Sequence, residues 1–145
     1  MALPALTNGS RMFQSNSLTS LPEGMTLPAL TDGFRMFEDN SLTSLPEGMA
    51  LPALTDGFSM FRGNPLTAVP ADFASQSNCT NWTDAFLDTS LTEQSIDNIL
   101  TNLAARGTSN GTFSQSGGSA PSAVGEAAID ALRGRGWDIN VTGGY

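Results

Sequence analysis

The side chains that could do acid–base chemistry in this chain are almost all carboxylates. The sequence contains no histidine and no lysine, and its six basic residues are all arginine. The commonest general base near neutral pH is therefore missing, and so is the amine needed for Schiff-base chemistry. The carboxylates of Asp32 and Asp56, and those of Glu23 and Glu47, recur at one and the same interval along the chain. Such a recurring column is typical of a solvated face, so we predict that the chain is not an enzyme.

The sequence also gives little support for a metal site or a reactive thiol. Asp32 and Asp56 could line a Ca²⁺ ladder, because carboxylate oxygens are ligands for that ion, but no loop has the ligand density of an EF-hand. We predict no metal site and no cofactor. Cys79 is the single cysteine of the sequence, so no disulfide forms within the chain. A small buried hydrophobe is favoured there over a reactive or intermolecular thiol.

The charge balance excludes some classes of partner. With a net charge of −8 over 145 residues, the chain repels phosphate backbones, and we expect no nucleic acid partner. No apolar run approaches the ~20 residues of a membrane-spanning helix, which predicts no membrane insertion. Only 14% of the residues are charged. Serine, threonine, asparagine and glycine supply the rest of the polar surface, as is common on extracellular or virion-exposed proteins.

The sequence repeats with a 24-residue period, in units that begin at Met1, Met25 and Met49. The second unit matches the first at 19 of 24 positions and the third at 15 of 24. A fourth, degenerate copy with one inserted residue places residues 85–92 over residues 60–67. One unit cannot bury its apolar residues alone, so we expect the units to stack on one another.

Fixed columns of residues predict how each unit folds. Leucines and a Met-Phe pair supply an apolar face, and either Met36 or Phe37 points inward. An asparagine column can hydrogen-bond the backbone of the next unit and form a ladder; it consists of Asn16, Asn40 and Asn64. A glycine column is predicted to take tight turns with positive φ; it consists of Gly9, Gly33 and Gly57.

The C-terminal third follows a different pattern. Thr92 is a good helix N-cap and Gly107 a good stop, which predicts a helix over 93–106. A short strand is predicted over 112–114, a second helix from 121–122 to about 133, and a half-buried strand over 137–142. The order helix, strand, helix, strand favours two parallel strands. We expect this part to cap the end of the stacked units.

The segment N-S-L-T-S-L-P-E-G-M, Asn40 to Met49, resembles part of the 24-residue leucine-rich repeat. Upstream of the asparagine the pattern departs, since Arg35 and Asp32 stand where apolar residues are usual. The Met-Phe pair is similar to the BspA-like repeat class of bacteria, which also occurs on phage structural proteins. The resemblance implies an α/β repeat fold. Residues 1–91 would be a leucine-rich-repeat solenoid of three 24-residue coils plus a degenerate fourth, and residues 92–145 a C-terminal α/β cap of the same structural unit.

A second resemblance lies between Leu91 and Trp137. The stretches L-T-E-Q-S-I-D-N-I-L, N-G-T-F-S-Q-S-G-G, A-P-S-A-V-G and R-G-W are similar to the closing segment of repeat proteins from bacteriophages, especially marine cyanophages, and their hosts. This implies a virion structural or host-recognition module of a tail, fibre or surface, located on the virion or outside the cell. It would act through protein–protein or glycan contacts. The alternative is a bacterial secreted adhesin or a filament subunit that stacks on itself.

The positions that differ between copies are the candidate binding residues. They cluster around the predicted strand: Phe34, Phe58, Arg11, Arg35, Glu38 and Arg62. Drift at exposed positions would produce the same variation. Phe34 and Phe58, on adjacent units, are expected ~5 Å apart, which is the strand spacing. If exposed, they form an aromatic ridge for a protein partner or a host-surface glycan; if they point inward, they belong to the core.

The first unit is expected to mediate assembly. Met1 falls in register with Met25 and Met49, so the sequence begins at a unit boundary with no cap over the apolar side chains and the strand edge of residues 1–24. A neighbouring subunit, another virion protein or a missing upstream segment could cover them. Proteins usually cover such an edge, because it invites aggregation. We therefore predict a homo-oligomer, or docking of residues 1–24 onto other virion or surface protein subunits.

Overall fold

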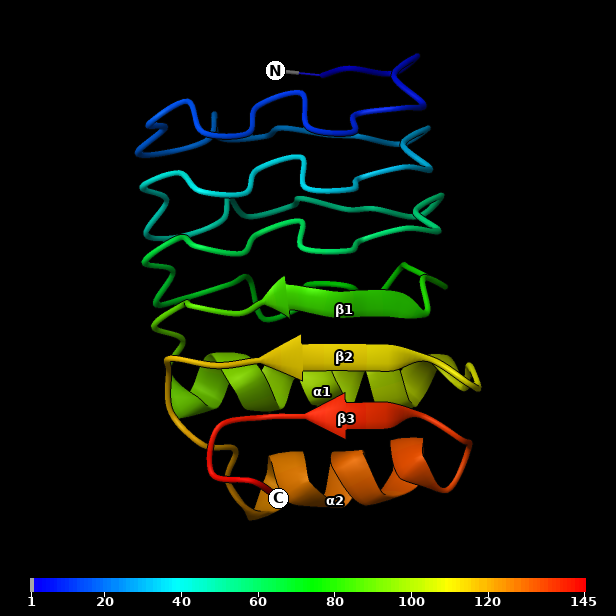
Figure 1. Ribbon diagram of the computed structural model, residues 1–145. Helices are drawn as coiled ribbons and strands as arrows, with labels where there is room; N and C mark the ends of the chain where they lie inside the picture. Colours follow the sequence, from blue (N-terminus) through cyan, green and yellow to red (C-terminus); the bar gives the residue numbers. More distant parts are fainter. Residues whose placement is uncertain (1) are drawn as a thin grey trace.

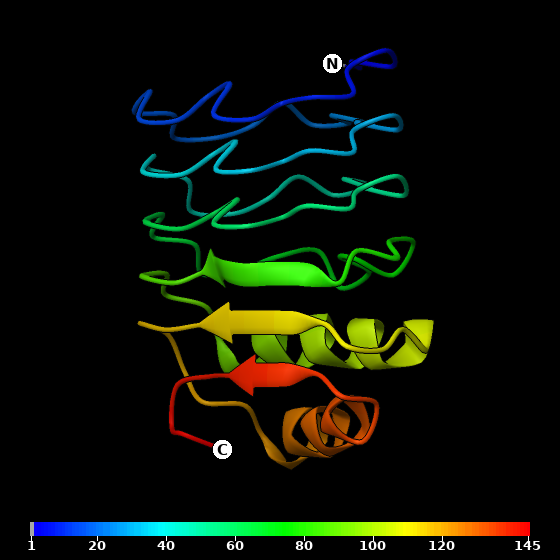
Figure 2. The same ribbon diagram turned by 45° about the vertical axis from the view of Figure 1, so that its right-hand side comes forward.

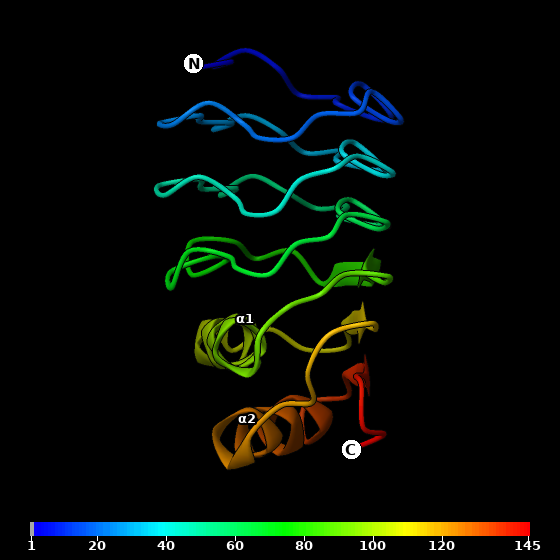
Figure 3. The ribbon, with the colours of Figure 1, turned by 90° about the vertical axis from the view of Figure 1, so that its left-hand side faces the viewer.

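The computed structural model describes residues 2–145 (Figure 1). Its helices and strands follow one another in the order β1 (Asn81–Phe86), α1 (Glu93–Arg106), β2 (Thr112–Gln115), α2 (Ala123–Arg133) and β3 (Asp138–Asn140). The strands form one parallel open sheet in the order β1-β2-β3. Both helices lie on the same side of that sheet (Figure 3). Met1, with which the first unit was predicted to begin, lies outside the described residues.

The predicted fold class, an α/β repeat in the form of a leucine-rich-repeat solenoid, is wrong. The regular elements are two helices and one three-stranded parallel open sheet, all between residues 81 and 140. Residues 2–80 contain isolated bridges and turns but no strand or helix. A leucine-rich repeat needs a strand in every unit, whereas Arg35 and Asp39 have φ of 53° and 55°, and Arg11 has φ of 56°. Residues in the left-handed region interrupt an extended strand.

The segments that carry the 24-residue pattern lie one above another (Figures 1 and 2). Parallel bridges join Asn8 to Asp32 and Asp32 to Asp56, which occupy the same position in successive units. The next bridge joins Asp56 to Asn81, one position beyond the strict period. The single inserted residue that the sequence predicted is therefore confirmed. We refer to residues 2–24, 25–48 and 49–72 as the first, second and third loops.

A column of stacked aromatic rings forms the core of these loops. The rings of Phe13 and Phe37 are 5.5 Å apart at 7°, and those of Phe37 and Phe61 are 5.7 Å apart at 4°. Phe86 of β1 continues the column, 5.5 Å from Phe61. Met36 and Phe37 are both 0% exposed. Both members of the Met-Phe pair are therefore buried, so the expectation that one of the two points outward is wrong.

The glycine column provides space for side chains of the next loop. A Cβ on Gly9 would lie 2.7 Å from the sulfur of Met36, and one on Gly33 would lie 2.9 Å from the sulfur of Met60. The predicted positive φ at these glycines is wrong, because the left-handed residues of the loops fall elsewhere, as at Arg11. The column is glycine because of close packing and not because of backbone conformation.

The asparagine ladder predicted from the sequence is confirmed. Asn40 Oδ1 accepts hydrogen bonds from the backbone N–H groups of Asn16 and Leu18, at 3.0 and 2.9 Å. Its Nδ2 donates to backbone carbonyls of its own loop and of the preceding loop. Asn64 repeats this arrangement one loop further on, where its Oδ1 accepts from the N–H of Leu42. Each of these buried side chains therefore joins two loops.

The C-terminal helices agree with the bounds expected from their caps. Thr92 caps α1 by accepting from Ser95 N–H, and Gly107 ends it with φ of 73°. Ser122 caps α2 in the same way. Neither helix of residues 2–145 is long and apolar enough to cross a membrane.

The strands agree less well with expectation. β3 is shorter than the predicted 137–142, because the backbone N–H of Trp137 donates to Leu132 O in the turn after α2 and that of Thr142 donates to the side chain of Gln115. The ring of Trp137 packs against Gly111, and its indole N–H donates to Thr108 O at 2.9 Å. No bounds were predicted for β1, which lies in the degenerate fourth copy. Asp84, with φ of 56°, interrupts it, and its register with β2 shifts between Trp82 and Phe86.

Candidate functional site

Four side chains on neighbouring loops stack on one another at the surface. We call them the Arg–Phe face: Arg11, Phe34, Arg35 and Phe58. The two rings are 5.2 Å apart and nearly parallel, at 12°. The guanidinium carbon of Arg11 lies 5.4 Å from the ring centre of Phe34, and that of Arg35 lies 5.2 Å from Phe34 and 5.9 Å from Phe58. These distances allow cation–π attraction, which holds two otherwise flexible side chains in place.

Turns within the loops set the position of the rings. Asp32 Oδ1 accepts the N–H of Phe34, and Asp56 Oδ1 accepts the N–H of Phe58, each at 2.9 Å. Arg35, with φ of 53°, then donates its backbone N–H to Phe58 O at 2.9 Å. The same local geometry recurs in the next loop, so one ring lies directly over the other.

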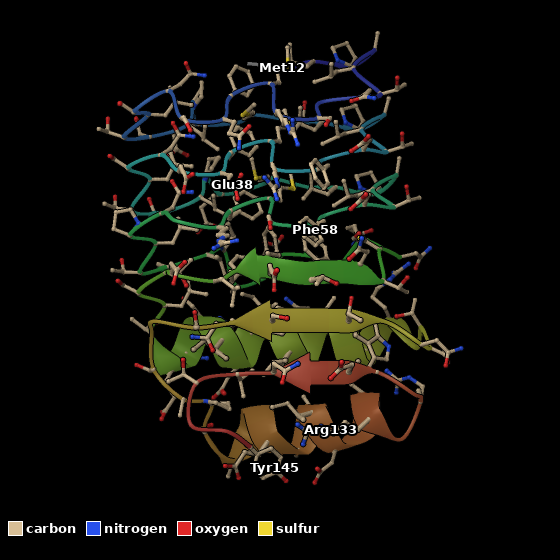
Figure 4. The ribbon with its side chains drawn as sticks, viewed as in Figure 1. Met12, Glu38, Phe58, Arg133 and Tyr145 are labelled. Carbon is tan, nitrogen blue, oxygen red and sulfur yellow. The ribbon has the colours of Figure 1, made fainter. Side chains whose placement is uncertain are left out.

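The predicted spacing of the two phenylalanines is confirmed, and their exposure lies between the two alternatives. Both rings are half-buried, so they belong neither to the closed core nor to a fully exposed ridge. Figure 4 shows Phe58 on the loop that lies next to β1, with Glu38 one loop further away. The outer edges of the rings are therefore available to a ligand, while their faces are largely covered by each other and by guanidinium groups.

Glu38 is the acidic partner of the Arg–Phe face. It is 3% exposed, and its Oε2 accepts from Gln14 Nε2 at 2.5 Å. The same oxygen lies 3.7 Å from Arg35 Nε, which is too far for a hydrogen bond. Within residues 2–145, Arg35 Nε has no hydrogen-bond partner. Gln14 was not among the predicted site residues, although it belongs to a column that differs between copies, and that variation could have identified it.

Arg62, the sixth predicted site residue, is engaged elsewhere. Its Nε lies 3.6 Å from Asp88 Oδ2, and both side chains are well exposed. The structure therefore brings five of the six predicted residues together and pairs the sixth with an acidic residue after β1.

The three C-terminal arginines serve the fold. Arg106 donates to Asn78 and to Ser75 O, and Arg133 and Arg135 donate to backbone carbonyls. By contrast, the guanidinium groups of Arg11, Arg35 and Arg62 donate no hydrogen bond within residues 2–145. Arg35 Nε is buried, so the donors that the Arg–Phe face retains for an external acceptor are those of Arg11 and the two terminal nitrogens of Arg35.

Other candidates for chemistry are occupied or closed. Asp32 and Asp56 act as backbone acceptors, and no group of three His, Cys, Asp or Glu residues in the described part of the chain could hold a metal ion. Cys79 is 1% exposed, which confirms it as a buried residue. Burial raises the pKa of its thiol from 9.0 to about 11, so the nucleophilic thiolate is scarce at neutral pH.

The Arg–Phe face can offer two planar cations and two apolar ring edges to one ligand. Its donors suit carboxylate or hydroxyl oxygens, and its rings suit the C–H surface of a sugar or an aliphatic side chain. No family model, no curated protein and no solved structure matches the chain.

Proposed function

We propose that the chain is a non-enzymatic recognition module of a virion structural or host-attachment protein, and that it binds a surface glycan through the Arg–Phe face. The virion context is supported by the resemblance of residues 91–137 to the closing segment of phage repeat proteins. One observation carries the binding role. Arg11 and Arg35 are held against half-buried rings, and apart from the buried Nε of Arg35 their guanidinium donors are free within residues 2–145.

A sugar that bears a carboxylate fits this chemistry best. A guanidinium group presents planar N–H donors that can hold a carboxylate through two hydrogen bonds. The apolar C–H side of the same sugar ring can lie along the edges of Phe34 and Phe58. Because stacking already restricts both arginines, binding costs less side-chain entropy than it would for free surface arginines.

The overall charge argues against a simple anion site. A chain with a net charge of −8 repels small anions at long range. A ligand therefore has to gain apolar contact as well as the charged hydrogen bond. The same repulsion acts on the carboxylates of a uronic-acid glycan, but unlike phosphate or sulfate its sugar rings can gain that apolar contact on Phe34 and Phe58.

Three features support a non-enzymatic role. The chain has no histidine and no lysine. The carboxylates nearest the Arg–Phe face, Asp32 and Asp56, accept backbone hydrogen bonds. Glu38 is buried and bonded to Gln14. None of these groups is placed to transfer a proton to a ligand on the rings.

Calorimetric titration of the full chain with a galacturonic acid hexamer tests the proposal. We expect binding of the hexamer, and weaker binding of a neutral galactose hexamer. Arg11→Gln and Arg35→Gln should each weaken binding about tenfold, which is the value of one charge-assisted hydrogen bond. Arg62→Gln is the matched control, because Arg62 lies outside the Arg–Phe face and beside Asp88. Loss of binding in that control, equal binding of both hexamers, or no binding of either would refute the proposal.

A secreted bacterial adhesin or a self-stacking filament subunit is the second candidate. It is supported by the apolar outer side of the first loop, where Met12 is 49% exposed. A gene that lies among tail and capsid genes supports the first candidate. Growth of the purified chain into fibres supports the second.

A further inference from the structure

The loops are joined by half of the hydrogen bonds of a parallel ladder. In the first loop, backbone N–H groups of alternate residues donate to carbonyls of the second loop at 2.8–3.0 Å. The donors are Gly9, Arg11, Phe13 and Ser15, and the acceptors are Asp32, Phe34, Met36 and Glu38. The second loop donates to the third in the same pattern, and the third donates to the segment that contains β1. All these N–H groups point toward the C-terminal end of the stack.

The N–H groups of the intervening residues donate within their own loop. The N–H of Ser10 donates to Asn8 Oδ1, that of Met12 to Gly9 O, and that of Gln14 to Arg11 O. These donors are therefore not available to a neighbour. An ordinary strand edge presents donors and acceptors in alternation, whereas this stretch of each loop presents acceptors alone on its outer side. Outward donors occur only beside the stretch, as where Thr31 and Asp32 N–H donate to Thr7 O and Ser41 N–H donates to Leu18 O.

In the first loop this row of acceptors is unpaired. The backbone carbonyls of Asn8, Ser10, Met12 and Gln14 are equivalent to those that receive bonds in the second loop, yet within residues 2–145 they accept none. We call these four carbonyls the acceptor edge. Figure 4 shows Met12 at the end of the stack opposite to the helices.

Apolar surface and one amide accompany the acceptor edge. Met12 is 49% exposed, and a hollow of about 290 Å³ is lined by Phe13, Leu18, Ser20, Leu21, Pro22 and Met25. Asn16 is exposed, and its side chain makes no hydrogen bond in the described part of the chain. Its counterparts Asn40 and Asn64 both bond the preceding loop. Each group that joins loops elsewhere is thus present here without a partner.

We propose that this side of the first loop is a docking surface for a further copy of the 24-residue unit. Opposite this row such a unit presents N–H donors at alternate residues, and beside the row it presents acceptors equivalent to Thr7 O and Leu18 O, as the first loop does toward the second. It would also place a phenyl ring on Phe13, as Phe13 lies on Phe37. The proposal continues an interface already present within the chain, and it is independent of glycan binding.

Other occupants fit less well. Two folded copies of this chain that met at their acceptor edges would oppose carbonyl to carbonyl along this row. An ordinary strand edge would place half of its own carbonyls against this row. Each unpaired and buried carbonyl costs free energy comparable to a lost hydrogen bond. The acceptor edge therefore favours a further 24-residue unit over a second folded copy or an ordinary strand edge.

The test is a titration of the full chain with a synthetic peptide of residues 25–48. The matched control peptide carries N-methyl groups at Gly33, Arg35, Phe37 and Asp39, so it keeps all side chains and loses the four donors. We expect the unmodified peptide to bind at least about tenfold more tightly than the methylated one. Asn16→Ala in the full chain should weaken the unmodified peptide as well, without lowering the stability of the chain.

Three results would overturn the proposal. Equal affinity of the two peptides would mean that only apolar contact matters. No binding of the unmodified peptide at about 1 mM would mean that the unit is not recognised. Concentration-dependent dimerisation of the folded chain, abolished by Met12→Glu, would identify a second folded copy as the occupant instead.

Discussion

Removal of the phenyl ring of Phe37 should strongly destabilise the chain. Phe37 is 0% exposed and lies between two parallel rings, those of Phe13 and Phe61. Phe37→Ala deletes a buried aromatic side chain, which typically costs ~3–5 kcal/mol. The loss of two stacked pairs, each worth about 0.5–1.5 kcal/mol, places the value at the upper end of that range. We expect a decrease in the free energy of unfolding of about 4–5 kcal/mol.

Urea denaturation, followed by far-UV circular dichroism and tryptophan fluorescence, measures this change. Phe34→Ala is the matched control, because Phe34 carries the same side chain in the same loop but is half-buried. It should cost less than about 2 kcal/mol. If Phe37→Ala costs under about 1.5 kcal/mol, or no more than Phe34→Ala, then the ring column does not hold the loops together.

Two further predictions concern buried polar groups. Asn64→Ala should lower the free energy of unfolding by about 2–4 kcal/mol, because it leaves buried backbone groups of two loops unpaired. Asn16→Ala is the control and should change the free energy of unfolding by under about 0.5 kcal/mol. Equal effects of the two substitutions in urea denaturation would contradict this prediction. The pKa of Cys79 is raised to about 11 by burial, so the folded state keeps the thiol proton after the unfolded state has lost it. The free energy of unfolding should therefore fall as pH rises from about 9 to about 11, and Cys79→Ala should lack this part of the pH dependence.

The repeat itself was the part of the fold that could be predicted from the sequence. The 24-residue spacing, the inserted residue before β1 and the asparagine ladder are all marked by residue identity. The helix caps at Thr92, Gly107 and Ser122 could also be predicted from the sequence, because capping is a local property of the residues involved.

The backbone conformation of the loops could not be predicted in the same way. The resemblance to a leucine-rich repeat suggested extended strands, but Arg35, Asp39 and their counterparts adopt positive φ. Arginine and serine at such positions give no signal, since glycine or asparagine is the usual marker. The glycine column led to the wrong expectation of positive φ. Gly9 and Gly33 are needed because they make room for the side chains of Met36 and Met60.

The candidate site was predicted in part. Variation between copies identified Phe34, Phe58, Arg11, Arg35 and Glu38, which the structure brings together, but it also selected Arg62, which pairs with Asp88. The acceptor edge could not be identified from the positions that differ between copies. It is made of backbone carbonyls, and their direction depends on the turns and not on side-chain type.

Proton NMR of the full chain during titration with the galacturonic acid hexamer tests glycan recognition most directly. The ring protons of Phe34 and Phe58 should shift as the hexamer is added, together with the guanidinium protons of Arg11 and Arg35. The buried ring of Phe73, which is 1% exposed, should remain unchanged. Saturating shifts confined to the Arg–Phe face would support glycan recognition there. Shifts centred on other residues, or no shift at the two phenylalanines, would contradict it.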